Sequence, residues 1–443
     1  MGHEADRPPD NYQVRVAHPG AVNTTYAMVA SLAERSLLAR FDTGFYCKEQ
    51  QWSWLLNRLP PRLAARALRE LKRRHAPGMP EDRIYQHPLW EILCIAAPRL
   101  GLSSRWLRAL RDHRNARFDR LIAGSLSRQG RRGAAPPDLL VVQDGSALQS
   151  LEAARRQGIP TVLNQVIGHY LHGREILLEE EARFPKLKGR LVMPRSADFL
   201  ASVAREPAAA DWILAPSDYV TETVVAQGAR RQRVLKLPYC VDTARFQAGP
   251  DKAGRKGPCR LLFVGQISQR KGLLYLLEAL KQLNDPALEL TLVGTIEAGA
   301  AGGAGGKTGD WLADYEDCFT ALANVPYSEV HALYRQADIF VYPSLHEGSP
   351  MAIFEAMASG LPVITTANAG SVVRDGEDGF LLPIRDVEGL KEKIILLKDD
   401  PGLCQTMGQA ARKAAEDYAP SRYGDRLLGC LATIARGREP EDC

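Results

Sequence analysis

Residues 338–366 read DIFVYPSLHEGSPMAIFEAMASGLPVITT, and the character of the chain changes several times along this stretch. A short apolar run is followed by a polar loop, a helical apolar pattern, a Gly-Leu-Pro turn and a second apolar run. Two short apolar runs joined by a helix are typical of a parallel βαβ unit, because parallel strands need a crossover connection. The stretch therefore predicts part of an α/β domain with a parallel sheet.

The same alternation recurs on both sides of this stretch. In the second half of the chain it predicts further strands at residues 260–264, 289–293, 362–365 and 380–382, separated by helices. In the first half it predicts strands at residues 12–17, 138–143, 161–166, 212–215 and 233–237. We therefore predict an α/β fold of two doubly wound, Rossmann-like domains. Ligands of such sheets bind beyond the carboxyl ends of the strands, so the chemistry is expected in the cleft between the domains.

Size and composition agree with a two-domain globular protein. The chain has 443 residues, of which 45% are hydrophobic and 25% are charged, and this length exceeds one ordinary core. We expect an N-terminal domain at residues 1–245, a second domain at 246–418 and a C-terminal helix within 419–443. No apolar run approaches the roughly 20 residues that cross a bilayer, and the first residues lack the layout of a signal peptide, so we expect a cytoplasmic protein. The eight cysteines form neither a Cys-x-x-Cys pair nor a short Cys/His cluster.

Positive charge is concentrated between Arg58 and Arg132, where 18 Arg or Lys stand against 6 Asp or Glu, a net charge of +12. Since the whole chain carries +5, the remainder carries −7. Four tryptophans lie in or beside this region: Trp52, Trp54, Trp90 and Trp106. We predict a basic helical insertion at about residues 49–132 that suits an anionic membrane surface or acidic lipid head groups. The alternative is a solvated helical surface, and a nucleic-acid role is disfavoured because no binding motif accompanies the arginines.

The loop and helix within residues 338–366 carry candidate binding residues. Ser349 is a good N-cap, and Pro350 suits the first helical position. The amides of Gly348 to Ala352, which include that of Met351, would then point from a positive helix end into the cleft, where sugar hydroxyls or phosphate oxygens can bind.

Two glutamates flank the start of this helix. Glu347 precedes it, and Glu355 lies about one and a half turns inside it. Such a pair can hold two parts of one elongated, hydroxylated ligand. The alternative is an ordinary loop carboxylate and a surface helix residue, since the spacing alone often occurs by chance.

A second candidate stretch is VGQISQRKG, residues 264–272. Gly265 ends a predicted strand, and the cations Arg270 and Lys271 follow next to Gly272. From there they can reach a pyrophosphate at the carboxyl edge of the sheet. The alternative is a solvated cationic pair before a helix.

Together these motifs resemble the retaining glycosyltransferases of family 4 (glycosyl transferases group 1), which have the two-domain GT-B fold. The matching runs are VGQISQRKG, ALYRQADIFVYPS (332–344), EGSPMAIFEAMASGLPVI (347–364) and DGEDGFLLP (375–383). The resemblance extends more loosely to residues 210–228 and 237–246. It implies a sugar transfer from a nucleotide-sugar, UDP- or GDP-linked, with retention of the anomeric configuration. It also implies that the C-terminal helix crosses back to the first domain.

The resemblance assigns roles to several of these residues. Glu347 would contact the hydroxyls of the donor sugar, Glu355 the ribose, and Arg270 with Lys271 the diphosphate. We expect a metal-independent reaction without a cofactor, because the chain has no Asp-x-Asp pair and these two cations can neutralise a leaving diphosphate.

The first domain offers weaker candidates. Gly20, in the loop after the first strand, would allow close approach of the diphosphate or acceptor. Members of the family carry a histidine near the reacting carbon; His169 is the nearest candidate and His172 the second, although their spacing departs from the usual pattern. A structural histidine is the alternative.

The acceptor is expected to be a glycan or a lipid-linked glycan, because of the basic, tryptophan-flanked region; a soluble acceptor is the alternative. Two other functions compete with transfer. One is a GT-B epimerase acting on a sugar nucleotide, and the other is a catalytically silent subunit that only binds a nucleotide-sugar.

Overall fold

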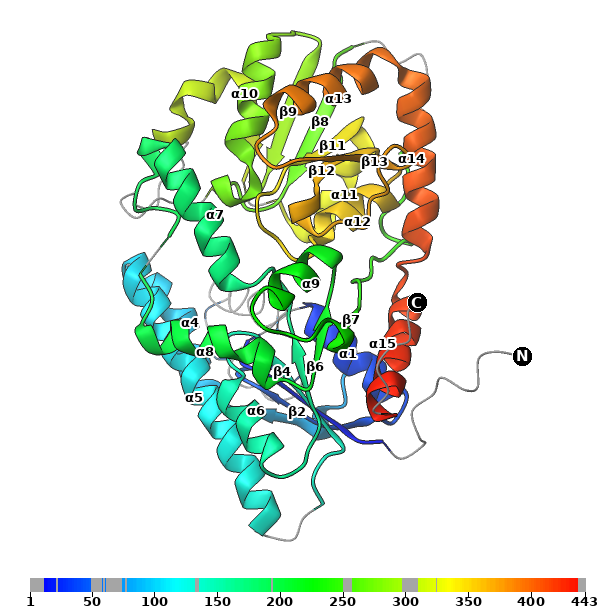
Figure 1. The fold of residues 1–443 in the computed structure, drawn as a ribbon. Coiled ribbons are helices and arrows are strands. Elements are labelled where there is room, and N and C mark those ends of the chain that lie inside the picture. The colour runs from blue at the N-terminus through cyan, green and yellow to red at the C-terminus, as the bar shows by residue number, and fades with distance from the viewer. Residues whose placement is uncertain are drawn as a thin grey trace, which may run out of the picture.

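The computed structural model describes residues 12–20, 23–48, 58, 60, 74–75, 78–131, 135–192, 194–249, 257–296, 310–323 and 325–436. Two parallel sheets lie one above the other, each flanked by helices (Figure 1). The first sheet has seven strands in the order β3-β2-β1-β4-β5-β6-β7. Its strands are Val14–His18 (β1), Leu38–Thr43 (β2), Ile84–Gln86 (β3), Leu139–Gln143 (β4), Thr161–Asn164 (β5), Trp212–Ala215 (β6) and Val234–Lys236 (β7).

The second sheet has six strands in the order β10-β9-β8-β11-β12-β13. Its strands are Cys259–Val264 (β8), Leu288–Val293 (β9), Thr320–Leu322 (β10), Ile339–Tyr342 (β11), Val363–Thr366 (β12) and Gly379–Leu382 (β13). The central strands β4 and β11 are buried along their whole length, as parallel strands covered by helices on both faces must be. The predicted α/β fold with two parallel sheets is confirmed.

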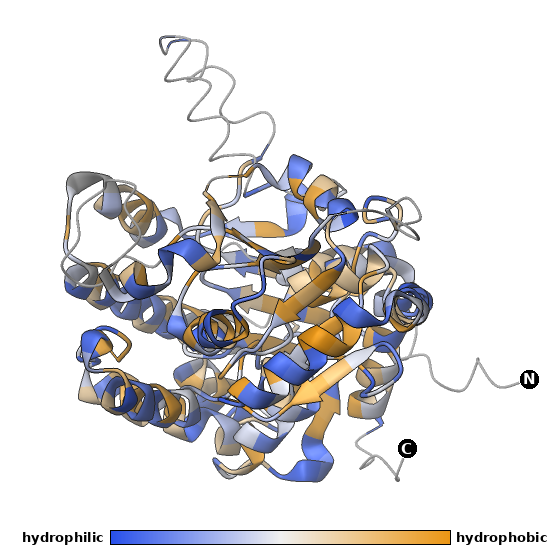
Figure 2. Ribbon diagram, turned by 90° about the horizontal axis from the view of Figure 1, so that it is seen from above, coloured by the Kyte–Doolittle hydropathy of each residue, from blue (hydrophilic) through white to orange (hydrophobic). Residues whose placement is uncertain are grey.

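Helices connect the strands and cover the sheets. In the first domain they are Asn23–Glu34 (α1), Pro88–Ala96 (α4), Ser104–Arg131 (α5), Leu148–Arg155 (α6), Tyr170–Arg183 (α7), Ala197–Ala209 (α8) and Asp218–Val225 (α9). In the second domain they are Leu273–Leu283 (α10), Tyr327–Gln336 (α11), Met351–Ala358 (α12), Val387–Asp399 (α13) and Pro401–Glu416 (α14). Hydrophobic residues concentrate on the strands and on the helix faces that cover them (Figure 2). Within the described residues, no helix combines the length and apolar character that a membrane crossing requires.

The last helix, Pro420–Ala435 (α15), returns from the second domain to the first (Figure 1). Its apolar face, which includes Tyr423, Leu427 and Leu431, belongs to the same buried cluster as β1 and α1. The first domain therefore buries apolar surface from both ends of the chain.

Helix α7 links the two domains. It follows β5 of the first domain, yet its residue Ile176 is part of the core of the second domain. Glu180, also on α7, is buried and accepts hydrogen bonds from Gln269 Nε2 (2.6 Å), Tyr275 Oη (2.9 Å) and Arg385 Nε (2.7 Å). A carboxylate of the first-domain helix is thus held by three groups of the second domain.

The basic region at residues 49–132 is only partly described. The apolar and basic pattern at residues 61–73 lies outside the described residues. The described part contains α4 and α5, as the helical pattern predicts, and also the short strand β3 at the edge of the first sheet, which the pattern does not predict.

Candidate active site

The loop between β11 and α12 carries Glu347 and is fixed from two sides. The Glu347 N–H donates to the Asn368 carbonyl (3.0 Å), and the Asn368 side-chain amide donates to the Leu345 carbonyl (3.0 Å). The Leu345 N–H donates to the Arg270 carbonyl (3.0 Å). The loop is therefore tied to the segment after β12 and to the segment after β8.

Arg270 and Lys271 converge on Glu347. They lie in a 3-10 turn, Gln269–Lys271, between β8 and α10, and the Arg270 guanidinium and the Lys271 ammonium both donate to Glu347 Oε1. Arg270 Nη1 also donates to the His346 carbonyl (2.9 Å). Gly272 ends the turn with φ of 70°, and a side chain there would overlap the Pro343 carbonyl, so only glycine fits. Carboxylate and cations thus meet at the carboxyl ends of β8 and β11.

These charges set each other's protonation. Burial alone would raise the pKa of Glu347, but Arg270 and Lys271 lower it to about 2. Burial lowers the pKa of Lys271 to about 8, although the Glu347 carboxylate opposes this. Near neutral pH the site therefore holds a carboxylate and two cations, and the lysine is the group closest to titrating.

The first domain touches this loop directly. The Gly168 N–H donates to the Glu347 carbonyl (3.1 Å), and Ser217 Oγ donates to the Gly348 carbonyl (2.6 Å). Gly348 packs so closely on Val166 that a Cβ would overlap the Val166 carbonyl oxygen. Residues 165–168 follow β5 and Ser217 follows β6, so the site lies where the carboxyl edges of both sheets meet.

His346 is a residue of this site that the sequence reasoning missed. Its Nδ1 is hydrogen-bonded to the Tyr219 hydroxyl (2.7 Å), across the two domains. Burial, helped by the Arg270 charge, lowers the pKa of His346 to about 3, so the ring is neutral at physiological pH. Its position directly before Glu347, at the carboxyl end of a strand, was the available signal.

The predicted His169 occupies a different environment. It is the buried N-cap residue of α7: its Nδ1 accepts from the Leu171 N–H (3.3 Å) and its Nε2 lies 2.9 Å from the Val203 carbonyl oxygen. Both ring nitrogens are thus engaged with backbone. His172 instead lies beside His346, with ring centroids 6.3 Å apart.

Glu355 forms a second polar cluster. On α12 it is buried, and it accepts from the Tyr327 hydroxyl (3.0 Å) and the Tyr334 hydroxyl (2.8 Å). Burial raises the pKa of Glu355, and the two tyrosines oppose this. The structure shows no direct contact between Glu355 and Glu347, so each would meet a different part of a ligand.

The start of α12 differs from the prediction in register. The helix begins at Met351, and Pro350 is the N-cap residue with an extended ψ of 127°. The predicted cap by Ser349 is therefore wrong, because the extended proline moves the first helical residue one position on. Ser349 Oγ is buried without a hydrogen-bond partner within the described part of the chain, which is the state expected of a group that serves a ligand.

The two remaining predicted glycines lie at strand ends. Gly265 follows β8 and packs on the ring of Tyr342. Gly20 follows β1, and its N–H donates to His18 Nδ1 (2.9 Å). Gly20 also lies against the Arg114 guanidinium, so it borders the basic helix α5 rather than the Glu347 loop.

Asp144 is a further polar residue that the sequence reasoning missed. It follows β4, and it accepts from Gln143 Nε2 and from Gln165 Nε2 (3.1 Å). Burial raises the pKa of Asp144 to about 7. Its position at a strand's carboxyl end was the signal that could have found it. Among the residues the structure describes, no three His, Cys, Asp or Glu side chains form a group that could hold a metal ion.

Comparison with known proteins finds a family match for the second domain. Residues 248–414 match the family described as "Glycosyl transferases group 1". Amylovoran biosynthesis glycosyltransferase AmsK of Erwinia amylovora is 31% identical over 194 residues, which are 40% of this chain and 46% of that protein. D-inositol 3-phosphate glycosyltransferase of Pseudarthrobacter chlorophenolicus is 28% identical over 297 residues, 62% of this chain and 66% of that protein.

Similarity of fold to solved structures extends beyond residues 248–414 to almost the whole chain. The crystal structure of Anabaena HepE in complex with UDP and glucose superposes with a TM-score of 0.56 at 14% identity, covering 96% of this chain and 100% of that one. The chain spans about half the length of most of the curated relatives that it matches. Residues 248–414 of this chain therefore form a glycosyl transferases group 1 domain, and the chain as a whole has the GT-B fold.

Proposed function

We propose that this protein is a retaining glycosyltransferase that moves a sugar from a nucleotide-sugar, UDP- or GDP-linked, to a glycan or lipid-linked acceptor, without a metal ion. The observation that carries the proposal is the convergence of Arg270 and Lys271 on Glu347 at the meeting point of the two sheets. The neighbouring HepE structure, which holds UDP and glucose, supports UDP as the nucleotide.

The charges suit departure of a diphosphate. Two cations side by side can hold its oxygens and neutralise the charge that develops as the glycosidic bond breaks. Other enzymes use a metal ion for this. The amides of Met351 and Ala352, the first two residues of α12, precede the first helical hydrogen bonds and add a positive helix end beside the two cations.

The carboxylates suit the sugar and the ribose. Glu347 is held by its two cations and can accept from the hydroxyls of the transferred sugar. Glu355 is held by two tyrosine hydroxyls on α11 and can accept from the ribose hydroxyls. Because a ribose and the transferred sugar lie at the two ends of a diphosphate, two separate carboxylate clusters match the donor.

The first domain completes the site as the acceptor side. We propose that Gly20 and the region beyond α4 face the acceptor, in a protein that stays in the cytoplasm and binds peripherally to an anionic membrane surface through residues 58–132. His169 has a positioning role in this scheme, since backbone groups engage both of its ring nitrogens.

Donor binding and slow donor hydrolysis test the proposal. A panel of UDP-, GDP-, ADP- and dTDP-sugars, with and without EDTA, is measured on the native protein, on Lys271→Met and on Glu355→Ala. Lys393→Met, on α13 of the second domain and partly exposed, is the matched control. We expect one donor to be bound and turned over in EDTA, both site variants to lose it, and the control to keep it.

The other outcomes separate the alternatives. Loss of turnover in EDTA, restored by Mg²⁺, would contradict metal independence. Donor binding without hydrolysis or transfer would favour a catalytically silent subunit. Isomerisation of the free donor would favour an epimerase. NMR of the anomeric proton in the first product formed would show retention or contradict it.

A further inference from the structure

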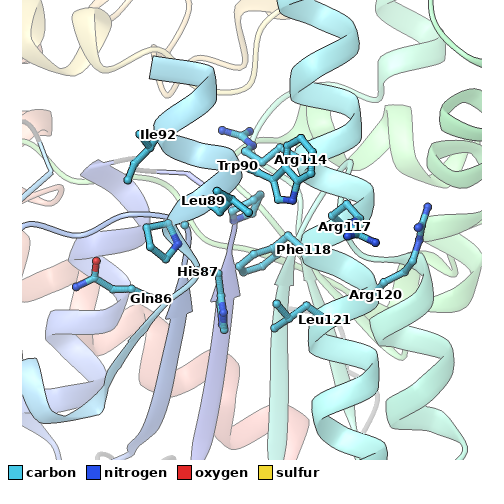
Figure 3. Close-up of a pocket in the computed structure, with 13 residues that line it drawn as sticks. Gln86, His87, Leu89, Trp90, Ile92, Arg114, Arg117, Phe118, Arg120 and Leu121 are labelled. Atoms are coloured by element: carbon cyan, nitrogen blue, oxygen red, sulfur yellow. The ribbon is translucent and has the colours of Figure 1, made fainter. Parts of the chain in front are cut away.

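A pocket opens in the first domain between α4 and α5, at the carboxyl ends of β1, β2 and β3 (Figure 3). It has a volume of about 760 Å³. Prolines 19 and 88 and the larger apolar side chains of the two helices form its walls, and three arginines of α5 line it: Arg114, Arg117 and Arg120. The proposed donor site uses none of these residues.

The apolar part of the pocket continues onto an exposed apolar surface. Leu89 is 66% exposed and Ile92 is 44% exposed, although both line the pocket. Most of the exposed large hydrophobic residues in the described part of the chain come from one stretch of sequence, residues 85–106: Tyr85, Leu89, Ile92, Leu93, Leu102 and Trp106. A concentration of this kind marks an interaction site rather than ordinary surface.

The arginines differ in how they are engaged. Arg114 Nη1 is paired with Glu91, which also binds Arg74 (2.6 Å). Arg117 and Arg120 are exposed and form no ion pair with any described residue. Their spacing of three residues makes them neighbours on the surface of α5, and Figure 3 shows them in succession along one side of the pocket.

The side chains of the pocket walls pack on one another and on neighbouring residues. The Trp90 ring packs on His113 with centroids 4.4 Å apart, and the His87 ring packs on Phe118 with centroids 5.8 Å apart. His87 Nε2 is in turn hydrogen-bonded to Asp42 Oδ1 (3.0 Å), on β2. The pocket is therefore preformed, which lowers the cost of ordering on binding.

We propose that this pocket binds the acceptor as a lipid phosphate, a phosphate ester of an apolar chain. The chain lies against Leu89, Trp90 and Phe118, and the phosphate is held by Arg117 and Arg120. A free phosphate would leave the apolar walls unused, and a neutral chain would leave the two cations unused, so only an amphiphilic anion matches both. This inference rests on the proposed function, of which it names the acceptor class.

The pocket lies at the carboxyl edge of the first sheet, the same edge that faces the donor site. Pro19 follows β1, whereas the loop that contacts Glu347 follows β5, and only β4 separates these two strands. Two strand spacings are about 10 Å, so an acceptor anchored in the pocket can extend a sugar along the sheet edge to the donor site.

Binding of a short, soluble probe tests the site. Decyl phosphate, decanol and inorganic phosphate are titrated by calorimetry, with the fluorescence of the tryptophans as a second signal. Two double variants alter the pocket: Arg117→Gln with Arg120→Gln, and Leu89→Ser with Ile92→Ser. Arg230→Gln with Arg231→Gln, on the exposed turn before β7, removes the same charge elsewhere, and Leu396→Ser removes an exposed apolar residue of α13.

We expect decyl phosphate to bind more tightly than decanol or inorganic phosphate. Each pocket variant should weaken the binding of decyl phosphate about tenfold or more, and the control variants should leave it unchanged. Equal binding by pocket and control variants would overturn the proposal. So would decyl phosphate binding no tighter than that of decanol or inorganic phosphate, because the chain and the phosphate would then not be bound together in one pocket. UDP-sugar binding is measured separately: its absence alongside tight decyl phosphate binding would defeat the proposed function and leave the lipid phosphate site.

Discussion

On the proposed function, the protonation of Lys271 should set the pH range of donor binding. Its pKa is lowered to about 8 by burial, and a nucleotide-sugar diphosphate stays fully ionised over the same range. Only the protonated lysine attracts it, so donor affinity should be constant below pH 8 and fall about tenfold per pH unit above it. A pH series of dissociation constants from pH 6 to 9.5 checks this.

Two variants make the assignment specific. Lys271→Arg keeps its charge at every pH used and should abolish the alkaline loss. Glu347→Gln removes the carboxylate that raises the pKa of Lys271, so the loss should begin at a lower pH. Affinity that stays flat to pH 9.5 in the native protein would contradict the role of Lys271.

Tyr219 and His346 provide a second test at this scale. Tyr219→Phe removes one partly buried hydrogen bond and leaves Nδ1 of the buried His346 without its partner, which should cost about 1–3 kcal/mol of the free energy of unfolding. Tyr85→Phe, at an exposed tyrosine, is the control and should change it by less than 0.5 kcal/mol or so. Urea unfolding of both variants measures the difference, and equal values would mean that the contact contributes nothing.

Among the elements, α7 depends on one buried carboxylate. Glu180→Ala leaves Arg385 Nε, Gln269 Nε2 and the Tyr275 hydroxyl without the carboxylate that they bind, and breaking a buried pair in this way costs about 3–5 kcal/mol. The neighbouring Glu179 also pairs with Arg385 but is 58% exposed, so Glu179→Ala should cost less than about 1 kcal/mol. Guanidinium unfolding of the two variants compares them, and a similar loss in both would contradict the importance of burial.

The elements also show where sequence reasoning succeeds and where it fails. The apolar runs of β4 and β11 predict their strands because both faces are buried. Strand β2 was missed because it contains Arg40 and Asp42, and the charge of Asp42 is paired inside the protein with Arg15. Pairing across strands that lie far apart in sequence leaves no local pattern.

Some contacts of the candidate site can be predicted from the sequence, and others cannot. The convergence of Arg270, Lys271 and Glu347 could be anticipated because each follows a strand at the same edge of one sheet. The contact between His346 and Tyr219 joins two domains through residues 127 positions apart, so no local spacing predicts it. The engagement of His169 by backbone also depends on α8, which packs against α7 only in the folded chain.

For the whole molecule, Gly348 controls how closely the two domains meet. A methyl group at this position overlaps the Val166 carbonyl of the other domain, so Gly348→Ala should separate the domains and lower transfer tenfold or more, by analogy with small displacements of catalytic groups. Gly429→Ala, on α15, meets no atom within 4 Å and should preserve transfer. Turnover together with small-angle X-ray scattering measures both effects; full activity in Gly348→Ala would contradict the need for this close approach.

The chain passes between the domains at two places, after β7 and before α15, and these two crossings touch: the Val241 N–H donates to the Tyr418 carbonyl (2.8 Å). Because the two connections meet at one point, they hold the domains together there. If the domains move relative to each other, we expect the displacement to be smallest at this point and larger at α7, where Glu180 joins the two domains. Substrates would then enter on the side of α7, and the stability of the Glu180 hydrogen bonds would determine how often the domains separate there.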